Sequence, residues 1–291
     1  MATFSDVLRR LYSDLITRRS RVRVAQATEP SLACDPVFVI GIYRSGTTLL
    51  RYVLDSHSSL ACPPESAFLA HLDRMANDER SRAGFESLGF DDDHVMSRMR
   101  AFAAYFFEGY AGSHGKPRWV DKSPNYVDHL EFIESIFPTS KMLMIYRHPL
   151  DQVDSAAKRG TIRYNELAPY VGEKEDEDSR IIHCRYWAAK AANMLAFEES
   201  DFPTHRLRYE DMCTDPEGVF RPIFDFLDEP WEDSVLEFYD SDHDKGNEDG
   251  RASATRGFVV SKSNYNSWPE DLKTQCWEIV EPVASRLGYE L

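Results

Sequence analysis

The sequence has little that would place the chain in a membrane or on a nucleic acid. No apolar run approaches the ~20 residues needed to span a bilayer, and there is no Asn-x-Ser/Thr glycosylation sequon. The 34 basic residues are outnumbered by 49 acidic ones. The resulting net charge of -15 disfavours nucleic acids and anionic membranes, because both need an electropositive face. We therefore expect neither as a partner.

Paired cysteines and metal-ligand clusters are also missing. The five cysteines are odd in number and widely scattered, and none has the CxxC or Cys/His spacing of a metal site. This pattern is typical of free thiols in a reducing compartment. The sequence thus predicts a cytoplasmic protein with no metal site.

Apolar runs that alternate with helical patterns organise the rest of the chain. Strand candidates occupy residues 37–41, 141–146 and 205–209, and each is followed by a helical pattern. Such alternation predicts an α/β fold in which a mostly parallel sheet is flanked by helices on both faces. We expect one domain over residues 1–291.

Two segments fall outside this alternating pattern. Residues 1–35 begin with an amphipathic helical pattern and predict an N-terminal helical extension. Residues 240–262 are polar and glycine-rich, which favours a mobile loop that orders when a ligand binds.

The first strand candidate leads directly into a glycine-containing loop. Gly41 and Gly46 have the spacing of a Walker A loop, in which backbone N–H groups and a helix N-terminus surround phosphate oxygens. The Walker lysine is missing, since Thr47 stands in its place and Arg44 is the nearby cation. A loop without that lysine opposes a P-loop kinase and suits a smaller anion than Mg-ATP. The expected anion ligands are Arg44, Ser45, Gly46, Thr47 and Thr48.

A second anion site is predicted around residue 147. Arg147 ends the apolar run 141–146, and Ser155 lies two turns into the helical pattern that follows. A guanidinium can bind a phosphate with two hydrogen bonds, and a hydroxyl can add a third. Two separate anion motifs predict a ligand with two phosphate groups.

Three motifs in this order resemble a known family. YRSGTT, YRHPLDQVDSAAKRG and RYEDMCTDP are similar to segments of the sulfotransferases that use 3′-phosphoadenosine 5′-phosphosulfate (PAPS). The resemblance runs from about residue 37 to the C-terminus and is strongest to the tyrosylprotein sulfotransferase branch. It implies a P-loop-like fold, PAPS as the sulfuryl donor, the Arg44 loop at its 5′-phosphosulfate, and Arg147 with Ser155 at its 3′-phosphate.

The resemblance also implies catalytic roles. Glu65 coincides with the catalytic base of the tyrosylprotein branch, and Lys122 with a lysine that contacts the bridging or sulfate oxygen. Arg44 would additionally polarise the transferring group. Other sulfotransferases use histidine as the base, so His57 and His71 remain alternatives.

The mobile segment and a strand end supply further candidates for donor binding. Arg251, Arg256 and Lys262 are possible contacts to the 3′-phosphate, with Ser253 and Thr255 as hydroxyl alternatives. Tyr209 falls at a strand end, where open α/β sheets bind their ligands.

The acceptor is the least determined part of the interpretation. We expect the hydroxyl of a small molecule or glycan, because an acidic protein is poorly suited to the acidic peptides of the tyrosylprotein branch. Protein-tyrosine sulfation and a non-catalytic nucleotide-binding protein remain alternatives, and a homodimer is possible. An aromatic stripe, Phe102, Tyr105, Phe106, Phe107 and Tyr110, is either core or an acceptor pocket.

Overall fold

The structure is a computed structural model that describes residues 34–172, 177–246, 256–260 and 264–291. The predicted helical extension over residues 1–35 lies outside the described residues, apart from its last two positions. The five cysteines are all free thiols, as the sequence predicted.

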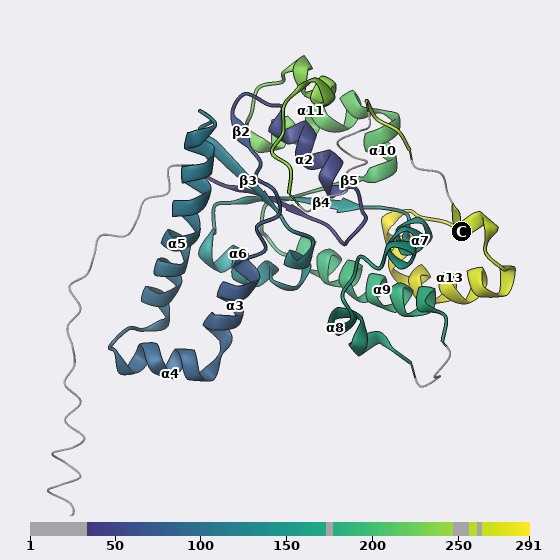
Figure 1. Cartoon of the computed structure of the whole chain (residues 1–291), viewed down its shortest axis with the longest axis horizontal. Helices are drawn as coiled ribbons and strands as arrows, with labels where there is room; N and C mark the ends of the chain where they lie inside the picture. The colour runs from purple at the N-terminus through teal and green to yellow at the C-terminus, as the bar shows by residue number, and fades with distance from the viewer. Residues whose placement is uncertain (1–33, 173–176, 247–255, 261–263) are drawn as a thin grey trace, which may run out of the picture.

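A five-stranded parallel sheet forms the centre of the molecule (Figure 1). Its spatial order is β2-β3-β1-β4-β5, and every neighbouring pair is parallel. The strands are β1 (Val37–Ile40), β2 (Leu60–Ala61), β3 (Arg118–Lys122), β4 (Lys141–Tyr146) and β5 (Thr204–Arg208). The predicted α/β class with a mostly parallel sheet is confirmed.

Two of these strands were not predicted. β2 is only two residues long, too short to show a period. β3 has the sequence RWVDK, whose charged residues resemble a turn. It nevertheless lies between β2 and β1, so its side chains Asp121 and Lys122 are buried in the middle of the sheet.

Helices cover both faces, because the strand side chains alternate between two apolar cores. Phe38 and Ile40 point into one core, and Val37 and Val39 into the other. The first is covered by α5 (Asp92–Ser113), α6 (Leu130–Ile136), α7 (Pro149–Arg159), α9 (Ser179–Glu198) and α13 (Glu270–Ala284). The second is covered by α2 (Thr47–Asp55), α10 (Tyr209–Thr214), α11 (Pro216–Leu227) and η3 (Asp233–Asp240).

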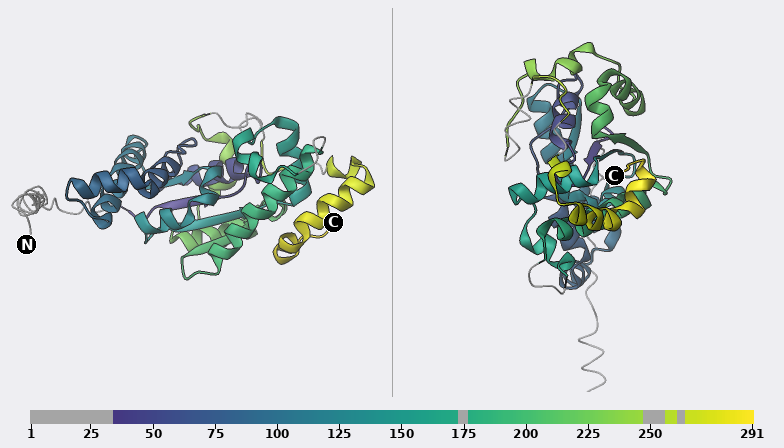
Figure 2. Two further views of the ribbon diagram at one scale, coloured as in Figure 1. Left: turned by 90° about the horizontal axis from the view of Figure 1, so that it is seen from below. Right: turned by 90° about the vertical axis from the view of Figure 1, so that its right-hand side faces the viewer.

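The remaining elements extend this core. α3 (Leu69–Asn77) and α4 (Glu79–Ser87) join α5 in a lobe at one end, with α13 at the other (Figures 1 and 2). A 3-10 turn, η1 (Pro124–Asp128), leads from β3 into α6. The short elements are α8 (Tyr164–Leu167), η2 (Ala168–Tyr170), η4 (Asn264–Ser267) and η5 (Ser285–Leu287). Within the described ranges, no helix has the length and apolar character to cross a membrane.

Candidate functional site

The loop between β1 and α2 is shaped by two residues in the left-handed backbone region. Arg44 has a φ of 72° and Gly46 a φ of 103°. At Gly41, where the chain leaves β1, an added Cβ would lie 2.6 Å from Ile145 Cγ2. Only glycine fits at this position. The turn brings α2 to its start at Thr47. Backbone N–H groups at such a helix start are suited to an anion.

A buried hydroxyl at this loop fits the same conclusion. Ser45 is fully buried, and its Oγ has no hydrogen-bond partner among the described residues. Buried polar atoms in folded proteins are nearly always hydrogen-bonded, so an unpartnered one at a helix start indicates a missing acceptor. A phosphate or sulfate oxygen meets that requirement. Thr47 is buried and Thr48 half-buried beside it.

The two predicted anion motifs lie side by side. Arg147, which follows β4, donates from Nη1 to the carbonyl oxygen of Arg44 at 2.9 Å. Arg44 in turn donates from Nε to Ser155 Oγ on α7 at 3.1 Å. Residues separated by more than a hundred positions thus meet at the carboxyl ends of β1 and β4, the edge where open α/β sheets bind ligands.

Tyr209 joins these two motifs. Its ring covers Gly46 so closely that a Cβ there would lie 2.4 Å from Tyr209 Cδ2. The Arg147 guanidinium carbon lies 4.6 Å from the centroid of the same ring, a cation–π distance. Tyr209 Oη donates to the carbonyl oxygen of Val259 at 3.1 Å, which brings residues 256–260 to the site.

Of the distal candidates, the structure describes one. Arg256 is exposed and lies three residues before Val259. Ser253, Lys262, Arg251 and Thr255 all lie outside the described residues.

Two further residues support the site, and Gln152 was missed in the sequence. Gln152 donates from Nε2 to the carbonyl oxygen of Tyr43 at 2.8 Å and accepts from Trp187 Nε1 at 2.9 Å. Glu210 Oε1 accepts from the backbone N–H of His148 at 2.8 Å. Gln152 lies three residues before Ser155 on α7, and this helical spacing was a usable signal for a second polar residue on the same face.

The predicted catalytic pair is in direct contact. Lys122 Nζ lies 2.6 Å from Glu65 Oε1. The Lys122 side chain is 1% exposed, whereas that of Glu65 is 35% exposed. Lys122 ends β3, and Glu65 follows the two prolines after β2, so neighbouring strands deliver the two charges. The arrangement pairs a buried ammonium with a carboxylate that is accessible to solvent.

Asp121 fixes the chain beside this pair. Its buried carboxylate accepts from Tyr126 Oη at 2.7 Å and from Ser66 Oγ at 3.0 and 3.1 Å. Burial raises the pKa of Asp121 to about 6, although the hydrogen bonds from Tyr126 and Ser66 lower it. Because Ser66 directly follows Glu65, these contacts hold the backbone next to the predicted base.

The two alternative histidine bases have different surroundings. His57 is fully buried, with Nε2 2.8 Å from the carbonyl oxygen of Pro230 and Nδ1 accepting from the Ser59 N–H at 3.1 Å. Both ring nitrogens are therefore engaged in hydrogen bonds to the backbone rather than directed at a substrate. His71 is exposed on α3.

The aromatic stripe divides between core and surface. Phe107 is buried and stacks on Trp119 with ring centroids 4.4 Å apart. Phe102 and Phe106 are 50% and 51% exposed, and both make edge contacts with Phe68, at 6.2 Å between centroids. Since Phe68 follows Glu65 by three residues, an exposed aromatic surface continues from the segment that carries the predicted base.

Comparison with known proteins agrees with this geometry. A sequence model described as the sulfotransferase family matches residues 36–233. Protein-tyrosine sulfotransferase 1 of Danio rerio is 26% identical over 269 residues, which cover 87% of this chain and 72% of that protein. An uncharacterized protein of Aquifex aeolicus is 28% identical over 218 residues, 70% of this chain but only 27% of that protein.

A solved structure shows the same fold. The sulfotransferase domain from the curacin biosynthetic pathway has a TM-score of 0.56 and 25% identity, covering 88% of this chain and 98% of that domain. The chain therefore belongs to the sulfotransferase family, as a PAPS-dependent transferase related to the protein-tyrosine sulfotransferase branch.

Proposed function

We propose that the protein moves the sulfuryl group of PAPS to a hydroxyl of a small molecule or glycan, with Glu65 as the base and Lys122 as the cation on the leaving group. The observation that carries this assignment is the 2.6 Å contact between these two side chains. Family membership supports the reaction class and the donor.

We propose that the donor is bound at both ends. At the 5′ end, the amides and hydroxyls of Ser45 to Thr48 and the Arg44 guanidinium take the phosphosulfate. At the 3′ end, Arg147 and Ser155 take the phosphate, and Tyr209 holds them against the loop. The hydrogen bond from Arg44 to Ser155 supports one continuous site for both ends. Arg256, Ser253 and Lys262 are proposed as further contacts.

The transfer is an in-line displacement, in which the protein acts by positioning the reactants and stabilising charge rather than by forming covalent bonds. A bond forms between the acceptor oxygen and sulfur while the bond from sulfur to the 5′-phosphate oxygen breaks. Lys122 stabilises the negative charge that develops on the departing oxygen. Glu65 takes the proton of the acceptor hydroxyl, for which it must lie about 3 Å from that oxygen.

The surroundings of Glu65 favour an acceptor with an apolar or sugar-like face. Phe68, Phe102 and Phe106 form an exposed aromatic surface that continues from the Glu65 segment. Aromatic rings bind apolar and stacked ligand groups. The net charge of -15 works against acidic peptides.

Protein-tyrosine sulfation is the second candidate, and the likeness to the Danio rerio enzyme supports it. The two candidates differ only in the acceptor. An acceptor screen with labelled PAPS, using phenols, alcohols, oligosaccharides and tyrosine peptides, separates them. Transfer to tyrosine peptides alone would contradict the small-molecule proposal. Cytoplasmic location and a homodimer stay predictions.

Glu65→Gln tests the base, because it keeps the size of the side chain and removes its basicity. Turnover with the best acceptor should fall by about 10² to 10⁴, while calorimetry finds unchanged affinity for adenosine 3′,5′-bisphosphate. Unchanged turnover would remove Glu65 from the mechanism. Binding of ATP in preference to the bisphosphate would contradict PAPS as the donor.

A further inference from the structure

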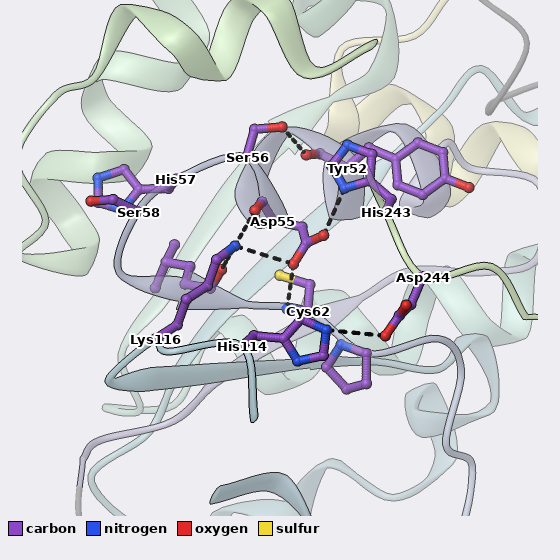
Figure 3. Close-up of polar contacts among 12 residues, drawn as sticks. Tyr52, Asp55, Ser56, His57, Ser58, Cys62, His114, Lys116, His243 and Asp244 are labelled. Carbon is purple, nitrogen blue, oxygen red and sulfur yellow. Dashed lines mark hydrogen bonds and ion pairs between the residues drawn. The ribbon is translucent and has the colours of Figure 1, made fainter. Parts of the chain in front are cut away.

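A cluster of polar residues around Asp55 binds the chain just before Glu65 (Figure 3). Asp55, the last residue of α2, accepts from the backbone N–H of Cys62 through Oδ1 at 2.9 Å. Its Oδ2 lies 2.6 Å from His243 Nδ1. One carboxylate thus binds both the chain three residues before Glu65 and a histidine 188 positions away in sequence.

Arg51, one turn earlier in α2, binds the carbonyl oxygens of the same stretch of chain. Its guanidinium is fully buried and donates from Nε to the carbonyl oxygens of Cys62 at 3.0 Å and Pro63 at 2.9 Å. Nη2 donates to the carbonyl oxygen of Asp244 at 2.7 Å. The peptide groups on both sides of Cys62 are therefore bound by a single helix.

Residues 243–246 close the cluster. The His243 side chain is 7% exposed and stacks on Tyr52 with ring centroids 4.6 Å apart. Gly246 lies against the proline before Glu65, where an added Cβ would be 2.6 Å from Pro64 Cβ. These residues belong to the segment 240–262 that the sequence predicts to be mobile, and its first part is held by α2.

We propose that Asp55, Arg51 and His243 are positioning residues that set the place of Glu65 relative to the phosphate loop. α2 begins at Thr47 in that loop and ends at Asp55. One helix therefore connects the phosphate loop with the residues that hold the chain before Glu65. The proposal rests on the proposed role of Glu65 as the base. Its physical reason is that a displacement of about 1 Å in a reacting group costs up to about 100-fold in rate.

His243 is held through both of its ring nitrogens. Nδ1 faces the Asp55 carboxylate, and Nε2 lies 2.8 Å from the carbonyl oxygen of Phe238. Both partners are oxygen atoms that can accept hydrogen bonds, so the ring is held at both of its nitrogens. Burial raises the pKa of Asp55, but the hydrogen bonds from His243 and the Cys62 amide outweigh burial and lower it. Asp55 is therefore held as a carboxylate at the centre of the cluster.

Other charged groups face Asp55 and His243 from neighbouring elements. Lys116 Nζ, from the turn before β3, lies 3.6 Å from Asp55 Oδ1. Asp244 Oδ2 lies 3.2 Å from His114 Nε2 at the end of α5 (Figure 3). The same oxygen accepts from Tyr110 Oη, in the last turn of α5, at 3.0 Å.

Two substitutions of His243 separate its contact with Asp55 from its contact with Phe238. An asparagine amide stands near the place of Nδ1 and can still donate to Asp55. A glutamine amide stands near the place of Nε2 and can still donate to Phe238. His243→Asn should keep kcat within about threefold, whereas His243→Gln should lower it about tenfold. The KM for PAPS should change less than twofold in both, because the phosphate loop is untouched.

A second readout does not depend on activity. In His243→Gln, hydrogen exchange of the peptide that contains the Cys62 amide should be faster than in the wild type, since Asp55 is no longer held. His205→Gln, a half-buried histidine on β5 far from this cluster, is the matched control and should change neither exchange nor kcat.

The possible outcomes are distinct. Slower turnover with faster exchange and unchanged bisphosphate affinity supports positioning. Equal kcat in wild type and His243→Gln, or an equal loss in the Asn and Gln variants, would overturn it, and so would a loss of bisphosphate affinity that matches the loss of kcat. If Glu65→Gln alone left turnover intact, the proposed base would fail, while faster exchange would still report the contact from His243 to Asp55.

Discussion

Arg44 Nε donates a hydrogen bond to Ser155 Oγ at 3.1 Å, although 111 positions separate the two residues. Arg44 belongs to the loop expected at the 5′-phosphosulfate and Ser155 to the helix expected at the 3′-phosphate. The contact makes the two motifs one surface. A ligand with a phosphate at each end would have to lie across this hydrogen bond.

Ser155→Ala should weaken binding of adenosine 3′,5′-bisphosphate about 10-fold, because a hydrogen bond to a charged group contributes about 1.5 kcal/mol. Calorimetry measures the change, and adenosine 5′-monophosphate should lose less affinity. Ser135→Ala, which removes a hydroxyl that donates to the carbonyl oxygen of Phe132 in its own helix, serves as the matched control. Equal losses for both nucleotides would contradict a 3′-phosphate contact.

Lys122→Met should lower kcat by about 10² to 10³, because it removes the charge proposed to stabilise the leaving oxygen and keeps much of the buried side chain. Lys190→Met removes another lysine with a mostly buried side chain, paired with Asp128, and should leave kcat unchanged. Steady-state kinetics with saturating PAPS measures both variants. A similar small loss in the two would indicate that Lys122 acts only through stability.

Gly46→Ala should weaken nucleotide binding and lower the melting temperature. The positive φ of 103° strains any other residue, and the new Cβ would lie 2.4 Å from the Tyr209 ring. Gly109→Ala, inside α5 with open space around its Cβ, should instead raise stability by about 0.5 to 1 kcal/mol. Thermal unfolding and calorimetry check the pair. Normal binding by Gly46→Ala would show that the loop backbone is more adaptable than we expect.

Phe102→Ser and Phe106→Ser should raise the KM for apolar or phenolic acceptors and leave the KM for PAPS unchanged. Each half-exposed ring removes apolar acceptor surface from water, which is worth about 1 to 2 kcal/mol. Leu88→Ser, an exposed apolar residue after α4, is the control. If the acceptor KM shifts equally in all three variants, the aromatic surface is not part of the acceptor site.

Asp121 should make stability depend on pH between about 4 and 6. The folded protein holds its proton up to a pKa of about 6, whereas the ordinary value is 3.8. Between these values the folded state binds more protons than the unfolded chain, so the free energy of unfolding falls as pH rises. Relative to Asp121→Asn, the wild type should lose up to about 3 kcal/mol across this window.

Chemical denaturation at several pH values measures this difference. Asp225→Asn, an exposed aspartate on α11, controls for the substitution itself. A wild type that gains stability over Asp121→Asn from pH 4 to 6 would reverse the sign and refute the buried carboxylate as its source.

The sequence by itself determined the local geometry of the proposed donor site. Gly41, Gly46 and the threonines define a strand, turn and helix within a dozen residues, because backbone preferences and helix starts depend on near neighbours. Arg147 and Ser155 were found in the same way, from a strand end and a helical spacing. The alternation of strands and helices was sufficient for the parallel sheet.

Tertiary structure alone decided which distant charges meet. β3 was hidden by its own charged residues, and only its place between β2 and β1 explains why Lys122 and Asp121 are buried. The contact from Lys122 to Glu65 spans 57 positions, and that from His243 to Asp55 spans 188. No local sequence pattern predicts such pairs. Packing of the whole chain buries these side chains and turns them toward each other.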